Sequence, residues 1–332
     1  MLEVANLALL QKLTRRSFAR RTIIYVGSSQ QWTVPASGVL VIRCLGAGGS
    51  GAAISANSAT THCALGGEAG TVGLKTLHAK KGDVFTLTLG AGGAAVGVGY
   101  AVSHGRDGGT TTVTGPGADI KIPGGKGGQY GAPAAGQILQ NPSNDAPTGL
   151  DWFVLNARNR GKAGELSGGG AAALLVGGSA HAAVGASTGG GAGVGSDGAS
   201  TPGSAGSVAG TTLFGEPLGR IGVQVVDVSH CWLLLDVSGT TYFGGTSAAG
   251  YLDKRYGSGN GGGPGSNTNP PGYEGGFGAG GGGASYSSTT AGAGGRGGGG
   301  GATNTGGKGS GSSYSGAGGN AFVTLELLET QP

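Results

Sequence analysis

The residues of this chain that could do chemistry begin with Gly46-x-Gly48-x-x-Gly51, directly after the apolar run VLVIRCL. This spacing after a strand is typical of a dinucleotide-binding unit, in which a helix opens at the third glycine and faces the pyrophosphate. In such units an acidic residue ~20 residues after the glycines binds the ribose, and Glu68 lies near that position. However, residues 50–67 have no helical apolar period, and their glycines and small polar residues disfavour a helix.

The same glycine motif recurs elsewhere in the chain, which weakens the cofactor interpretation further. GAGG returns at Gly90, Gly278, Gly292 and Gly316, and the full G-x-G-x-x-G spacing recurs at Gly278 and Gly292 inside plain glycine tracts. A pattern that repeats in this way is a product of the glycine-rich composition. We therefore predict no nicotinamide site and no other cofactor.

Other catalytic signatures are missing from the sequence. It contains no H-E-x-x-H and no G-x-S-x-G, and none of its Gly-Lys pairs is followed by the Ser or Thr of a phosphate-binding loop. His62 beside Cys63 is a weak metal pair, because adjacent side chains on a strand point to opposite faces. Asp227 and Asp236 have the residue type of a glycosidase pair, but strand-end aspartates usually belong to turns. We predict no metal site and no enzyme.

The composition restricts the class of protein. The chain has 81 glycines in 332 residues and 11% charged residues, against ~7% and ~25% in ordinary proteins. Glycine loses the most backbone entropy on folding and buries no side chain, so the fold must rely on close backbone packing or on shared burial in an oligomer. Residues 1–21 carry a net charge of +4, equal to that of the whole chain. The balanced remainder argues against nucleic-acid binding.

Cysteine usage and hydropathy indicate a protein assembled in a reducing cytoplasm. Cys44, Cys63 and Cys231 are odd in number and widely spaced, so a disulfide framework is not expected and Cys44 is predicted to be a buried thiol. No apolar stretch approaches the ~20 residues that span a membrane. We therefore predict no membrane insertion.

Residues 1–22 are predicted to form one N-terminal α-helix. An apolar stripe at helical spacing is made by Leu2, Ala5, Leu9 and Leu13. Because a helix of this length is marginal alone, it needs a surface to pack on. Two alternatives follow: the helix packs on its own protein, or it attaches the protein to a neighbouring protein or to its own copies.

Beyond residue 22 the sequence predicts strands. β-Branched and alternating runs stand between Gly, Pro and Ser at 23–26, 31–34, 39–45, 71–77, 83–90, 110–115 and 321–329. Glycine recurs at every third position from Gly294 to Gly300, which favours stacked polyglycine-II segments. The expected fold is all-β: a glycine-rich β-sandwich-like framework over 23–139 and 261–332, with 140–260 as an inserted region or second lobe.

An ordered set of motifs resembles a known family. Trp32-Thr33-Val34-Pro35 leads into an apolar strand that ends in GAGG, and a KxGDxxTLTLGAGG strand, a GGTTTV unit and further glycine tracts follow before a last strand. This order resembles the glycine-rich domain of bacteriophage tail-fibre and other virion appendage proteins, over residues 31–131 and 275–329. The 140–260 segment has no counterpart in that pattern, and the chain has no long shaft repeat.

The resemblance implies a virion protein, commonly a homotrimer, that takes part in host attachment. Two functions remain open. In the first, glycine loops and aromatic residues contact a cell-surface glycan or protein; in the second, the protein is a purely structural virion component, such as a capsid decoration or a baseplate–fibre connector. For the first function we expect contact residues in glycine-rich surroundings. They are Tyr251, Asp253, Lys254, Arg255, Tyr256, Tyr273, Phe277, Tyr286 and Tyr314.

Overall fold

The computed structural model describes the chain over residues 18–54, 63–98, 102–131, 137–155, 158–162, 170, 187–189, 200–202, 274–275, 278, 280–285, 290–304 and 313–330. These residues form strands and extended segments without a helix, which confirms the all-β class. No helix among them is long and apolar enough to cross a membrane. The predicted N-terminal helix falls mostly on residues 1–17, with Leu2, Ala5, Leu9 and Leu13, which lie outside the described residues. Its last part was predicted wrongly: residues 18–22 begin a β-strand that pairs with the last strand of the chain.

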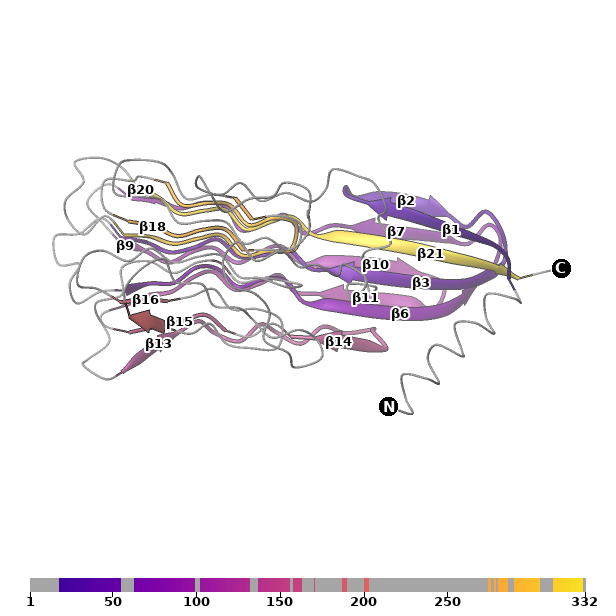
Figure 1. Ribbon diagram of the computed structural model, residues 1–332. Coiled ribbons are helices and arrows are strands. Elements are labelled where there is room, and N and C mark those ends of the chain that lie inside the picture. The colour runs from indigo at the N-terminus through magenta and orange to yellow at the C-terminus, as the bar shows by residue number, and fades with distance from the viewer. Residues whose placement is uncertain are drawn as a thin grey trace.

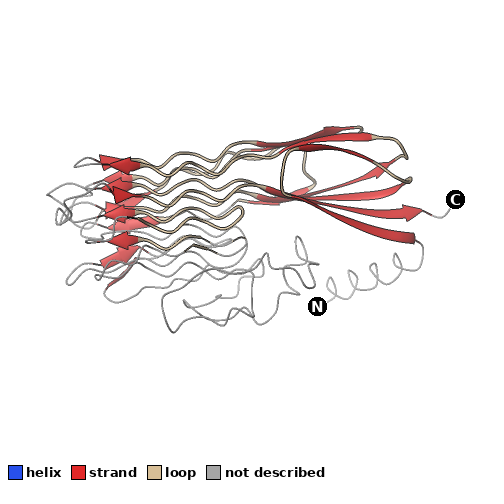
Figure 2. Ribbon diagram, turned by 90° about the horizontal axis from the view of Figure 1, so that it is seen from above, coloured by secondary structure: helices blue, strands red, loops and turns tan. Residues whose placement is uncertain are grey.

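The molecule is elongated and has two parts (Figures 1 and 2). Two β-sheets lie at one end, and a bundle of extended, wavy segments runs from them to the other end, where short strands close it. The first described strand starts and the last one ends at the sheet end, because Phe18 pairs with Thr330 there. The chain therefore enters and leaves the described structure far from the end of the bundle.

The larger sheet has five antiparallel strands. Their spatial order is β1 (Phe18–Val26), β21 (Phe322–Thr330), β3 (Gly38–Leu45), β6 (Val72–Ala79) and β14 (Trp152–Val154). The alternating burial of β3 follows its sequence, in which Leu40, Ile42 and Cys44 face inward. Burial raises the pKa of the Cys44 thiol to about 12, which suits the predicted buried thiol.

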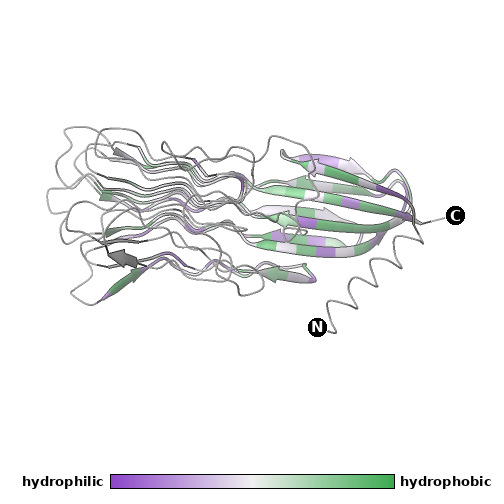
Figure 3. Ribbon diagram, in the orientation of Figure 1, coloured by the Kyte–Doolittle hydropathy of each residue, from purple (hydrophilic) through white to green (hydrophobic). Residues whose placement is uncertain are grey.

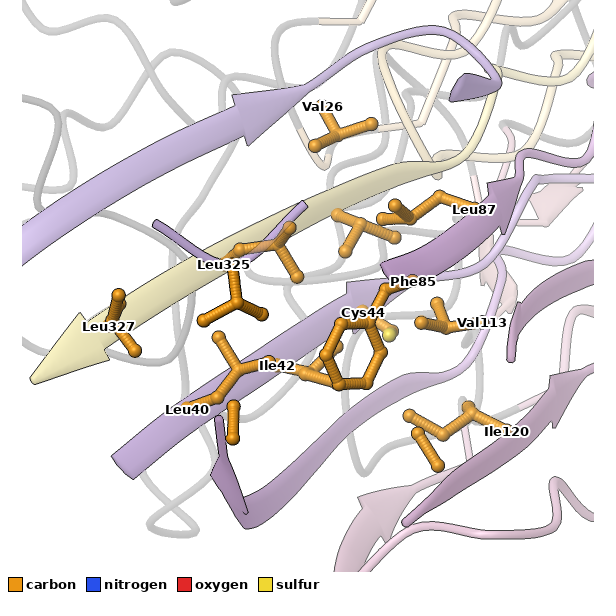
Figure 4. Close-up of a cluster of buried hydrophobic side chains, with 14 of the residues drawn as sticks. Val26, Leu40, Ile42, Cys44, Phe85, Leu87, Val113, Ile120, Leu325 and Leu327 are labelled. Carbon is orange, nitrogen blue, oxygen red and sulfur yellow. The ribbon is translucent and has the colours of Figure 1, made fainter. Parts of the chain in front are cut away.

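The smaller sheet has four strands in the order β11 (Ala118–Ile122), β10 (Thr111–Gly115), β7 (Val84–Thr88) and β2 (Gln30–Thr33). Its apolar residues meet those of the larger sheet in one buried cluster, where Phe85 of β7 lies next to Ile42 and Cys44 (Figure 4). Hydropathy alternates along these strands, as one buried and one outward face require (Figure 3).

A charged cluster on the opposite face of the larger sheet joins three of its strands. Glu326 of β21 pairs through one oxygen with Arg21 of β1 and through the other with Arg43 of β3, both at 2.5 Å. The Glu326 side chain is only 8% exposed. The carboxylate is therefore held between two guanidinium groups on neighbouring strands.

The second part of the molecule, here called the glycine bundle, comprises residues 46–54, 63–71, 90–98, 102–110, 123–131, 281–285, 290–304 and 313–321. Short strands mark its far end. They are β4 (Ala53–Ile54), β5 (Cys63–Ala64), β8 (Gly97–Val98), β9 (Val102–Ser103), β12 (Tyr130–Gly131), β18 (Ala284–Ser285), β19 (Thr303–Asn304) and β20 (Ser313–Tyr314). Two antiparallel pairs accompany them: β13 (Ile138–Gln140) with β15 (Arg160–Lys162), and β16 (Ser187–Gly189) with β17 (Ser200–Pro202).

Segment 46–54 lies at the centre of the glycine bundle and hydrogen-bonds to six neighbouring segments. Its N–H groups donate to carbonyls of 63–71, 102–110 and 313–321, and its carbonyls accept from 90–98, 123–131 and 297–304. Each neighbour in this ring also bonds to the next one: for example, Gly105 donates to Gly128, and Gly316 donates to Gly301. The result is a hexagonal array held mainly by backbone hydrogen bonds, with some side chains as additional acceptors, such as Ser50, which accepts from the Arg106 N–H.

Close approach of backbones explains the glycines of the central segment. A Cβ added at Gly48 would lie under 3.0 Å from the carbonyl oxygen of Gly298, and one at Gly51 would lie equally close to that of Gly301. Real Cβ atoms essentially never come so near another backbone. The G-x-G-x-x-G word is therefore a packing element in this fold, and its N–H groups donate to carbonyls of the chain itself.

Candidate functional site

The far end of the glycine bundle is the region where exposed aromatic residues meet chain reversals. The chain arrives there in β4, β8 and β19 and leaves in β5, β9 and β20, so that described strands begin and end side by side. Positions next to chain connections on a rigid scaffold are where binding residues usually lie. The far end is consequently the candidate functional site of the described structure.

Tyr314 in β20 is the one predicted contact residue that the structure describes. Its residue is 48% exposed, and β20 pairs with β8 so that Tyr314 lies opposite Gly97. A Cβ added at Gly97 would lie 2.5 Å from Cε1 and 2.7 Å from Cδ1 of the ring. The tyrosine ring thus occupies the space that a side chain at position 97 would fill. One side of the ring is supported by backbone, and much of the rest remains open to solvent.

A second aromatic contact lies on neighbouring segments of the same end. The rings of His104 and Tyr130 stack with their centroids 4.2 Å apart. The backbone N–H of Tyr130 donates to Nδ1 of His104 at 3.3 Å. A neutral imidazole that accepts at Nδ1 carries its proton on Nε2, which makes that atom a donor. His104 is exposed and Tyr130 is half-buried, so the histidine is the accessible member of the pair.

Buried asparagines attach the segment after β12 to the side of the glycine bundle. Asn141 donates from Nδ2 to the Gly66 carbonyl at 2.8 Å and to Oε1 of Glu68 at 2.7 Å. Asn159 donates its backbone N–H to the same Glu68 oxygen at 2.6 Å. Asn144 accepts from the Lys126 N–H at 3.0 Å and donates to the Ala69 carbonyl at 2.8 Å. These side chains provide the hydrogen bonds that a further backbone segment would otherwise provide.

Lys126 holds a charged cluster beside these asparagines. Its Nζ lies 2.9 Å from Oδ2 of Asp145 and 3.3 Å from Oδ2 of Asp107. The hydrogen bond with Asp145, together with the attraction of Asp107, raises the pKa of Lys126 above its ordinary value. Because the ammonium pairs with two carboxylates of the same chain, this cluster joins the segment that carries Asp145 to the glycine bundle. In the described ranges, no group of three or more His, Cys, Asp and Glu side chains is placed to hold a metal.

Most of the predicted contact residues fall outside the part of the chain that the structure describes. Those that lie outside the described residues are Tyr251, Asp253, Lys254, Arg255, Tyr256, Tyr273, Phe277 and Tyr286. Sequence reasoning missed His104 and Tyr130, whose partnership joins two segments that are separate in the sequence. It also missed the bonds of Asn141 and Asn159, because asparagines in a Pro- and Asn-containing stretch are typical of ordinary turns.

Comparison with protein-family models and with curated proteins finds no match. The functional interpretation therefore rests on the geometry described above and on the motif order of the sequence.

Proposed function

We propose that this protein is a bacteriophage virion component of a tail fibre or spike, assembled in the host cytoplasm, and that the far end of the glycine bundle contacts a receptor on the host cell. The observation that carries the proposal is the opposite placement of two features. The described chain begins and ends at the sheet end, whereas exposed Tyr314 and His104 lie at the far end of a long, narrow body. That polarity suits a protein held at one end and binding at the other.

The glycine bundle supports this proposal as a rigid spacer. Its extended segments, their hydrogen bonds to several neighbours and their backbone contacts are the features of a polyglycine-II array. Such an array orders each segment by hydrogen bonds in more than one direction, unlike a flat sheet. Residues fixed on its end lose little further entropy when they bind a ligand.

Attachment to other virion proteins is assigned to the sheet end, through the N-terminal residues. Residues 1–17 precede β1, whose start lies at that end. Contact with own copies, as in a homotrimer, is supported by apolar side chains at the edge strand β14. Trp152 and Phe153 are both 40% exposed, and Leu155 is 38% exposed. Apolar groups gathered at a strand edge favour pairing with another chain.

Electron microscopy of virions tests the proposal. Particles are labelled with a gold-conjugated antibody against the full chain and imaged in negative stain. Label at the outer ends of fibres or spikes is the expected result. Label on the capsid surface or between baseplate and fibre would instead favour a purely structural component, and unlabelled virions would contradict a virion role altogether.

A further inference from the structure

Tyr314 has the geometry of a platform for a sugar ring. Gly97 supports one part of the tyrosine ring with backbone alone, and 48% of the residue is exposed. The face of an aromatic ring carries partial negative charge. The C–H bonds on one face of a pyranose carry partial positive charge and form an apolar surface, so the two faces attract each other. A supported ring needs no reordering before such contact.

The surroundings of the tyrosine ring fit the same ligand. Segment 90–98, which carries Gly97, is flanked by 313–321 on one side and 102–110 on the other. Ala94 and Ala95 of the same segment are exposed. His104 follows β9 on the other flanking segment and presents Nε2 as a hydrogen-bond donor. An apolar surface with a few polar groups at its border is typical of sugar sites.

We propose that Tyr314, supported by Gly97, stacks on a pyranose ring of a bacterial surface glycan. The inference rests on the proposed host attachment and adds the chemical class of the ligand. The exposed ring face makes the contact. The phenol hydroxyl contributes less, because a stacked sugar lies over the ring carbons.

The test measures binding of the fluorescently labelled full chain to a panel of bacterial strains. Cells of the strain that binds most are treated with periodate, which cleaves vicinal diols of sugars, or with proteinase K. The proposal predicts that periodate abolishes binding and that proteinase K leaves it intact. Binding that resists periodate and is lost with proteinase K would overturn the glycan assignment while leaving host attachment in place. Absence of binding to every strain would instead contradict the proposed function itself.

Three variants locate the contact. Tyr314→Ala is expected to weaken binding about tenfold, which corresponds to the loss of about 1.4 kcal/mol of stacking. Tyr314→Phe keeps the ring and is expected to bind within about threefold of the wild type. Gly97→Ala removes no functional group but displaces the ring, and should weaken binding as Tyr314→Ala does. Equal loss in Tyr314→Phe and Tyr314→Ala would overturn the stacking contact, and so would unchanged binding in Tyr314→Ala. Thermal melting of each variant checks that the fold is retained.

Discussion

Asn141 donates from Nδ2 to Oε1 of Glu68 at 2.7 Å in a place where both residues are only 1% exposed. The two residues are 73 positions apart in the chain. Their hydrogen bond joins the stretch after β12 to the segment that starts with β5, on the outside of the hexagonal array. A buried, charge-assisted hydrogen bond of this kind makes the position of the outer segment specific.

Replacing Asn141 with alanine should destabilise the protein by roughly 1–3 kcal/mol, because the half-buried Gln129 N–H and the buried Gly66 carbonyl and Glu68 carboxylate each lose a partner. The free energy of unfolding from denaturant titration measures the change. Gln31→Ala is the control, since the Gln31 side chain is exposed and its hydrogen bond to Thr86 is long, at 3.5 Å. Equal stability of the two variants would show that the buried network contributes nothing.

Gly51→Ala should destabilise the glycine bundle by about 3 kcal/mol or more, because the added methyl group meets the Gly301 carbonyl and backbone must move. Gly82→Ala provides the comparison. Gly82 has a φ of 88° and open space around its Cα, so alanine there costs only about 1 kcal/mol of backbone strain. Thermal unfolding is measured for both variants: the loss of stability in Gly51→Ala reports the cost of close backbone packing, and that in Gly82→Ala reports the cost of backbone strain. A milder effect at Gly51 than at Gly82 would contradict the hexagonal array.

Lys126 should stabilise the fold in a pH-dependent way. Its pKa is raised above the ordinary value of 10.5 in the folded state, so its contribution is complete below about pH 10.5 and is lost as pH rises through the raised pKa. Asp107 and Asp145 are well exposed, so solvent screening limits the contribution to about 1 kcal/mol or less. The stability of Lys126→Met is compared with that of the wild type. Their difference should shrink above about pH 10.5, and a difference that grows there would refute this role.

Self-association should depend on the edge strand β14. Changing Trp152 and Phe153 together to serine should lower the oligomeric state measured by light scattering, with little loss of stability, because both residues are 40% exposed. Val84→Ser on the other sheet, where Val84 is 43% exposed, serves as the control. A wild-type chain that is monomeric at micromolar concentration would refute the homo-oligomer.

The strands of the two sheets follow from the sequence because one buried face requires alternation. The runs that became β3, β7 and β21 were all predicted within a few residues of their ends. β11 was not predicted, although the Pro116-Gly117 turn before it, with Gly117 at a φ of 73°, is a recognised hairpin signal. Its burial alternates in the same way as that of β3.

The centre of the glycine bundle was harder to predict, for a geometric reason. The period of three from Gly294 to Gly300 does not mark one extended segment: the chain reverses at Gly297, which has a φ of 72°, and Gly298 and Gly301 donate back to Gly295 and Gly292. The central segment 46–54 has neighbours on every side, so small residues fill nearly all of it and no period remains. The site partners Gly97 and Tyr314 are likewise far apart in the chain, and only the fold brings them together.

Competition for host cells tests the central claim most directly. Host bacteria are incubated with the purified full chain before the virus is added, and the adsorption rate constant is measured. If the protein is the receptor-contacting component, saturating amounts should reduce adsorption about tenfold or more, whereas Tyr314→Ala protein should compete poorly. The claim would be contradicted if the protein is present in virions but the purified wild-type chain leaves the adsorption rate constant unchanged.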